Sequence, residues 1–151
     1  MKVIVGSRDL WPVPAVASAV LAIMVSTDDD FAVRANRADL LASGTEELAW
    51  KIGDRVGRHV IRYKPFAEDN NFNRDVNMVR GADRVYAFFA HGQFMQGGTG
   101  HVVSCALREG VPVEAYELDE DGNVVETATD EGDLGPEMYS GLKNPTRREW
   151  K

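Results

Sequence analysis

The chain has 151 residues, 44% hydrophobic and 27% charged, and its 17 Lys and Arg against 24 Asp and Glu give a formal net charge of −7. This length is sufficient for one domain with its own core, and the single cysteine, Cys105, excludes an internal disulfide framework and a cysteine-based zinc site. No apolar run approaches the roughly 18 residues of a membrane span, and the N-terminus turns polar too early for a signal peptide, so we expect a cytoplasmic protein without membrane contact.

The negative charge is concentrated toward the C-terminus. Residues 1–116 contain 13 basic and 14 acidic side chains, which gives 13 − 14 = −1. A protein that coats nucleic acid needs a basic surface to release counterions from phosphates, so we expect no non-specific nucleic-acid binding. Residues 117–133 contain no Lys or Arg and eight acidic residues: Glu117, Asp119, Glu120, Asp121, Glu126, Asp130, Glu131 and Asp133.

Apolar runs separated by turn signals predict alternating strands and helices. Short, continuously apolar runs indicate buried strands, and apolar residues three or four apart indicate helices with a buried face. The sequence predicts strands at residues 3–5, 31–33, 59–63, 83–89 and 111–116, and helices within residues 13–25, 48–56, 72–79 and 102–107.

Two local signals refine this pattern. Ser-Gly-Thr-Glu at residues 43–46 has the spacing of a capping box at the start of the second helix. Asp-Gly at residues 121–122 predicts a hairpin turn, with residues 124–125 returning as an edge strand. We expect no regular structure from residue 127 onward.

The alternation predicts an α/β protein with a Rossmann-like, doubly wound, mainly parallel five-stranded sheet and helices on both faces. Residues 1–116 would form this domain, and residues 117–151 an acidic hairpin and a charged, irregular tail packed on it or extending from it. Ligands of such sheets bind at the carboxyl ends of the strands, where the strand order reverses. If the first and fourth strands are neighbours, the loops at residues 6–11 and 90–100 flank the same site.

The first candidate site is the cluster Gly97, Gly98, Thr99 and Gly100, between the fourth strand and the next helix. Glycines let the backbone approach a ligand, and the N–H groups at a helix start, with the helix dipole behind them, favour phosphate. The alternative is a tight turn that binds nothing.

A second candidate follows the first strand at Gly6, Ser7 and Arg8. The Ser7 hydroxyl and the planar Arg8 guanidinium suit a phosphate. Alternatively, Ser7 and Asp9 cap the following helix and Arg8 faces solvent.

The helices contribute further candidates. Arg74 and Asn77 are three residues apart and therefore neighbours on the third helix; they either project into the site or belong to a solvated surface. His101 lies at a helix start, which disfavours the imidazolium, so we expect a neutral, hydrogen-bonding side chain. Cys105 is predicted to be a buried, inert thiol, and no histidine has partners at metal-ligand spacing.

Taken together, Gly-Ser-Arg-Asp at residues 6–9, the segment 72–89 and Gly-Gly-Thr-Gly-His at residues 97–101 resemble the SLOG superfamily. This Rossmann-like group includes the lonely-guy phosphoribohydrolases, the SMF/DprA proteins and many small bacterial and phage proteins. The resemblance covers roughly residues 1–116 and depends on the order and spacing of the motifs. It implies a nucleotide phosphate at residues 97–100 and makes Arg74 a site residue.

The chain departs from the lonely-guy pattern at three positions, one of which is His101 at the position of a Thr. Those enzymes cleave the base from a nucleoside 5′-monophosphate with an Arg and a Glu. Here Arg74 matches the Arg, but Asp75 replaces a Lys and Ser104 stands at the position of the Glu. A neutral hydroxyl neither stabilises an oxocarbenium ion nor activates water well, so the resemblance implies absent or altered hydrolase chemistry.

We therefore expect a module that binds or senses a nucleotide or nucleotide-derived ligand. Residues 97–100 and Ser7 would hold phosphate, Arg8 and Arg74 would neutralise it, and Asn77 and His101 would orient the sugar or base.

Two alternatives remain. One is an N-glycosidic bond enzyme, either a nucleoside 5′-monophosphate phosphoribohydrolase or a relative of the nucleoside deoxyribosyltransferases, with Arg74 and Asp75, or Asp9, as catalytic groups. The other is an interaction protein whose acidic segment, residues 117–133, meets a basic partner. We expect no cofactor and no metal, and a homodimer, because the superfamily commonly dimerises through helices beside the sheet.

Overall fold

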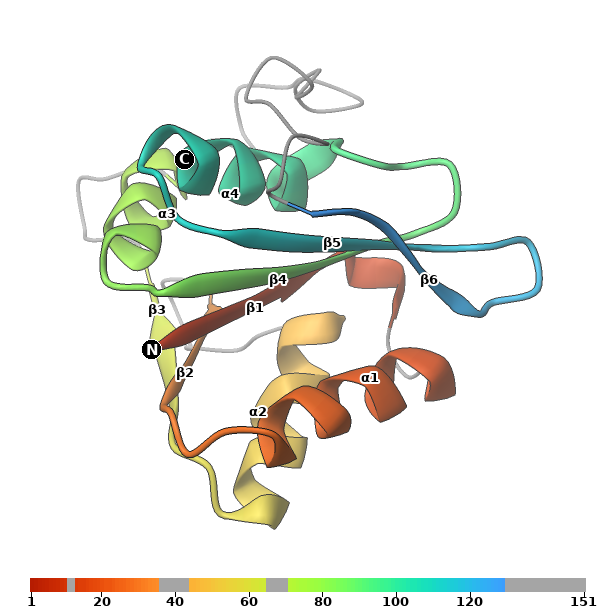
Figure 1. The fold of residues 1–151 in the computed structure, drawn as a ribbon, viewed down its shortest axis with the longest axis horizontal. Helices are drawn as coiled ribbons and strands as arrows, with labels where there is room; N and C mark the ends of the chain where they lie inside the picture. The colour runs from red at the N-terminus through yellow and green to blue at the C-terminus, as the bar shows by residue number, and fades with distance from the viewer. Residues whose placement is uncertain (11–12, 36–43, 65–70, 130–151) are drawn as a thin grey trace.

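The computed structural model describes residues 1–10, 13–35, 44–64 and 71–129 (Figure 1). The predictions for Ser43 and for residues 130–151 lie outside these ranges. The elements, in chain order, are β1 (Lys2–Gly6), a short 3-10 helix η1 (Arg8–Leu10), α1 (Pro14–Val25), β2 (Phe31–Arg34), α2 (Thr45–Val56), β3 (Val60–Tyr63), α3 (Asn71–Arg80), β4 (Arg84–Phe89), α4 (Gly97–Arg108), β5 (Val113–Leu118) and β6 (Val124–Thr129).

The strands form one six-stranded sheet in the order β3-β2-β1-β4-β5-β6. Strands β1 to β5 are parallel, and β6 runs antiparallel to β5. This confirms the predicted Rossmann-like, doubly wound α/β fold, with a hairpin strand added to five parallel strands. The order reverses between β1 and β4, which pair from Lys2 beside Arg84 to Gly6 beside Phe88. Their carboxyl ends therefore flank the position at which such sheets bind ligands.

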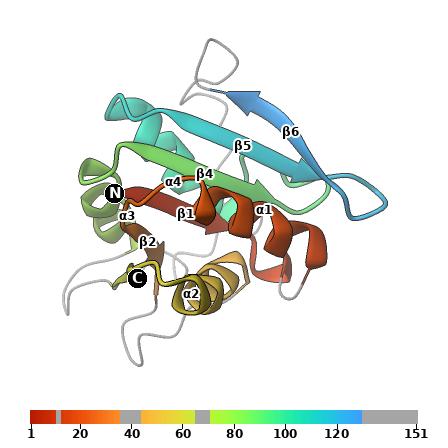
Figure 2. The same ribbon diagram turned by 60° about the horizontal axis from the view of Figure 1, so that its bottom comes forward.

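Helices cover both faces of the sheet. α1 and α2 pack together on one face, and α3 and α4 pack together on the other (Figure 1; Figure 2). Phe88 and Phe89 are both fully buried but enter opposite hydrophobic clusters, because successive side chains of a strand point to opposite faces. Burial on both faces explains why the parallel strands are continuously apolar in sequence. None of the described helices is long and apolar enough to cross a membrane.

Three of the differences from the predicted bounds concern α4, β5 and β6. α4 begins at Gly97, so the glycine cluster forms its first turn instead of preceding it. β5 continues to Leu118, past residue 116. The prediction of no regular structure from residue 127 onward is wrong for residues 127–129, which belong to β6. β6 extends this far because its pairing with β5 continues to Thr129 beside Glu114, and local composition does not reveal such a pairing.

Candidate functional site

The turn after β1 is joined to the end of β4 by two hydrogen bonds. The Ser7 N–H donates to the carbonyl oxygen of Phe88 at 3.0 Å. The Ser7 hydroxyl oxygen accepts from the N–H of Ala90 at 3.1 Å. The loops after β1 and β4 therefore meet at the carboxyl edge of the sheet, as expected for neighbouring strands.

Gly6 allows α2 to start directly against the end of β1. A Cβ atom at Gly6 would lie 2.1 Å from the Thr45 hydroxyl oxygen, so any side chain there would displace the helix. The Gly6 N–H donates to Glu46 Oε1 at 3.0 Å. The predicted capping box is wrong, because the N-cap of α2 is Gly44, without a side-chain hydrogen bond, and the Glu46 carboxylate turns toward the sheet. A charged donor at the end of β2 attracts this carboxylate more strongly than a backbone N–H would.

That donor is Arg34, the last residue of β2. Its Nε donates to Glu46 Oε2, and its Nη2 donates to the Gly6 carbonyl oxygen at 3.0 Å and to the Thr99 hydroxyl at 3.1 Å. Burial opposes the charge of the guanidinium, but Glu46 and Asp75 outweigh it and raise the pKa of Arg34. For the Glu46 carboxyl group the effect of burial is larger than that of Arg34, and its pKa is raised. This buried ion pair therefore connects β1, β2, α2 and α4.

Several N–H groups without an acceptor among the described residues lie where the Arg34 side chain approaches the start of α4. A Cβ atom at Gly98 would stand 2.9 Å from Arg34 Nη1, so the missing side chain leaves the guanidinium close to the helix start. Nη1 donates to none of the described residues. The N–H groups of Gly97, Gly98 and Thr99 also find no acceptor in the described ranges, and the N-cap of α4, Gln96, makes no side-chain hydrogen bond.

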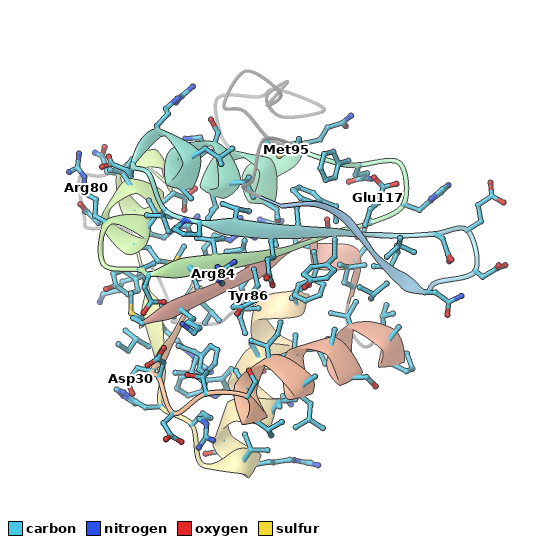
Figure 3. All side chains as sticks on the ribbon, in the orientation of Figure 1. Asp30, Arg80, Arg84, Tyr86, Met95 and Glu117 are labelled. Atoms are coloured by element: carbon cyan, nitrogen blue, oxygen red, sulfur yellow. The ribbon has the colours of Figure 1, made fainter. Side chains whose placement is uncertain are left out.

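The turn into α4 has an unusual backbone. Met95 has a φ of 59° although it is not glycine, and Gly97 has a φ of 70°. Met95 is 1% exposed and packs in the cluster beneath α3 and α4. Its burial holds a conformation that costs a non-glycine residue about 1–2 kcal/mol. Figure 3 shows Met95 and Glu117 toward the same end of the sheet. Backbone strain of this kind is common at ligand sites.

A second buried ion pair reaches the same edge from α3. Arg74 Nε donates to Asp75 Oδ1 at 3.0 Å, and Arg74 Nη1 donates to the carbonyl oxygen of Ala35, just after β2, at 3.3 Å. The other carboxylate oxygen, Asp75 Oδ2, lies 2.8 Å from Nδ1 of His101 on α4. Burial lowers the pKa of Arg74, an effect that Asp75 partly offsets and that the charge of Arg34 increases. Both oxygens of Asp75 are thus engaged by protein donors.

The structure brings most of the predicted residues to one edge. The first two turns of α4 supply Gly97, Gly98, Thr99, Gly100 and His101. Ser7 and Arg74 reach the edge from β1 and α3, and both backbone polar groups of Gly6 are taken by protein partners. The side chains of Arg8 and Asn77 are exposed, and neither side chain has a hydrogen bond to a described residue.

Sequence reasoning missed two residues of the site, Arg34 and Glu46. The sequence pattern assigns no role to Arg34, and it predicts for Glu46 only a place in the capping box. A charged residue closing a buried parallel strand is nevertheless a usable signal, because the carboxyl end of that strand is where ligands bind. Glu46 carries no comparable signal, since its partner lies twelve residues away in the chain.

Deeper in α4, Cys105 and Ser104 are buried. Cys105 Sγ lies 3.5 Å from Nε2 of His101. Burial, with the charge of Asp75, raises the pKa of this thiol to about 11, which agrees with an inert cysteine. The Ser104 hydroxyl has no hydrogen-bond partner among the described residues. Within the same ranges, no group of His, Cys, Asp and Glu side chains is arranged to hold a metal ion.

Comparison of the chain with protein-family models and with curated proteins found no match.

Proposed function

We propose that the chain binds the phosphate of a nucleotide or nucleotide-derived ligand at the carboxyl edge of the sheet, as a binding or sensing domain of the SLOG superfamily. One observation carries the proposal: Arg34 Nη1 and the first N–H groups of α4 lie together, and none of them has an acceptor in the described residues. Such donors are costly to leave unpaired in a partly buried place, and an anion would satisfy them.

Phosphate suits this set of donors for two physical reasons. A helix N-terminus presents N–H groups together with the positive end of the helix dipole. A guanidinium adds a permanent charge and a planar arrangement of donors that matches phosphate oxygens. Gly98 is exposed, so the first turn of α4 is open to solvent at this residue.

Thermal unfolding in the presence of nucleotides tests this proposal. A bound ligand raises the melting temperature, by about 5–10 °C at a concentration of roughly 100 times its Kd for a protein of this size. The substitution Gly98→Asp should abolish the rise, because a carboxylate at this position would bond to Arg34 Nη1 and repel phosphate.

Ser18→Asp is the matched control. Ser18 is exposed on α1, so the substitution adds the same charge on the opposite face of the sheet. This variant should retain the full ligand-induced rise. The proposal fails if no mono-, di- or triphosphate nucleotide shifts the wild-type transition, or if Gly98→Asp leaves the shift unchanged.

The bond between Asp75 and His101 supports a second candidate, an N-glycosidic bond enzyme. A buried carboxylate on one imidazole nitrogen orients the ring and selects its tautomer, and Asp75 is the acid/base group of this candidate. If this candidate is correct, incubation with the four common nucleoside 5′-monophosphates releases free base, and Arg74→Ala abolishes the release. If chromatography detects no base under conditions in which nucleotide binds, the chain is not this enzyme.

A further inference from the structure

The four buried charged side chains of the candidate site carry a net charge of zero. Arg34 with Glu46, and Arg74 with Asp75, form two ion pairs. The side chains are 14% and 5% exposed in the first pair and 9% and 2% exposed in the second, so solvent screens their charges weakly. The two pairs also interact, because Asp75 raises the pKa of Arg34 and Arg34 lowers that of Arg74. Positive and negative charges therefore cancel within one poorly screened volume.

The neighbouring segments of the sequence add no net positive charge. Arg8 and Asp9 are adjacent in η1 and cancel each other. In the sequence, the segments between β2 and α2 and between β3 and α3 contain two basic residues, Arg37 and Lys64, and three acidic residues, Asp39, Glu68 and Asp69. An anion at this edge is therefore attracted by unpaired N–H donors and the dipole of α4, which act at short range.

We infer that the site accepts a phosphate with a single negative charge, as in a phosphodiester, in preference to a dianionic monoester or a polyphosphate; this inference rests on the proposed function. The first negative charge gains the hydrogen bonds of Arg34 Nη1 and the helix start. A second charge must also leave water, and it meets the carboxylates of Glu46 and Asp75 as well as the guanidinium groups. It therefore bears a desolvation cost with no net attraction to offset it.

This charge balance specifies the class of ligand. A phosphate monoester carries a charge of about −1.5 to −2 near neutral pH, because its second pKa is about 6. A phosphate esterified on both sides keeps one negative charge over the same range. Cyclic nucleotides and nucleotides joined through a phosphodiester have this property, whereas nucleoside monophosphates and triphosphates do not.

Isothermal titration calorimetry with matched ligand pairs tests the inference in the wild-type chain. Each of the four common nucleoside 5′-monophosphates is compared with its 5′-methylphosphate ester, which differs by one methyl group and about one charge. We expect the ester of the preferred base to bind at least as tightly as the monophosphate. A monophosphate that binds more than about threefold tighter than its ester overturns the inference and leaves the proposed function standing. If no member of any pair binds while a di- or triphosphate nucleotide does, the inference is overturned; if no nucleotide of any kind binds, the proposed function is overturned as well.

The substitution Glu46→Gln tests the physical cause. It removes one buried negative charge beside Arg34, so the monophosphate should gain about tenfold relative to its ester. Asp54→Asn makes the same charge change at an exposed position in the last turn of α2, away from the site, and should leave the ratio of affinities unchanged. An unchanged ratio in a folded Glu46→Gln protein overturns the explanation. If this variant does not fold, the comparison of ligands on the wild-type chain remains the test of the inference.

Discussion

Each buried carboxylate at the carboxyl edge depends on a specific cationic partner. Glu46 is 3% exposed and receives hydrogen bonds from Arg34 and from the Gly6 N–H. Asp75 is 2% exposed and lies between Arg74 and His101. Removing one partner of such a pair leaves the other charge without its attraction but with its full desolvation cost. At the residue scale, these partners therefore contribute to stability as well as to the site.

The substitution Arg34→Met should lower the free energy of unfolding by about 3–5 kcal/mol, because it leaves the Glu46 carboxylate buried without its cationic partner. Urea denaturation measures the loss. The double variant Arg34→Met with Glu46→Leu should recover most of it, since the buried charge is then gone as well. A loss below about 1 kcal/mol in the single variant would show that water or another cation takes the place of Arg34.

At the scale of elements, ion pairs also hold the amino ends of the strands. Lys2 Nζ in β1 lies 2.9 Å from the carboxylates of Asp29, before β2, and Asp83, before β4. Hydrogen bonding to Asp29 and then Asp83 raises the pKa of Lys2, and hydrogen bonding to Lys2 lowers the pKa of Asp83 from its ordinary value of 3.8. These contacts are largely exposed, so salt screens them and their contribution is small.

The stabilisation by Lys2 should depend on pH in a defined direction. The lowered pKa of Asp83 means that its contribution is present above pH 3.8 and is lost as the pH falls through the folded-state value. The raised pKa of Lys2 means that its contribution is present below 10.5 and is lost at higher pH. Lys2→Met should therefore be less stable than the wild type near neutral pH and equally stable near pH 2. A difference that persists in strong acid would contradict this account.

At the scale of the whole molecule, α1 leaves apolar surface exposed. The helix has no charged residue, and Leu21 and Val25 are 42% and 57% exposed. Val16, Val20 and Met24 on its inner side are fully buried. Two exposed apolar side chains one turn apart on an uncharged helix favour a protein–protein contact at this surface.

We expect the chain to form a homodimer in which this surface of α1 is covered. Sedimentation equilibrium should give twice the chain mass of 16.7 kDa for the wild type. Leu21→Glu should give the monomer, because it would bury an unpaired charge in the contact. Ser18→Glu adds the same charge on α1 and tests whether the contact extends to that position. A wild-type chain that sediments as a monomer at high concentration contradicts the expectation.

The predicted elements agree well with the observed ones where local pattern decides structure. The run Phe31-Ala32-Val33 can be buried only as a strand between two layers, and Val16, Val20 and Met24 can share only a helix face. The prediction failed where a partner distant in the sequence determines the conformation of a residue. The Glu46 carboxylate leaves its capping position for Arg34, and residues 127–129 become a strand only by pairing with β5.

The sequence alone determined the order of strands and helices, and with it the Rossmann-like sheet, because hydrophobic periodicity is a local property of the chain. It also located the glycine turn at the start of α4. Only the tertiary structure decided which charged residues lie at that turn: Arg34 and its partner Glu46 do, although the sequence pattern indicated neither as a site residue. The reason is that a buried charge must find its counterion in three dimensions, and the nearest counterion in space is seldom the nearest in sequence.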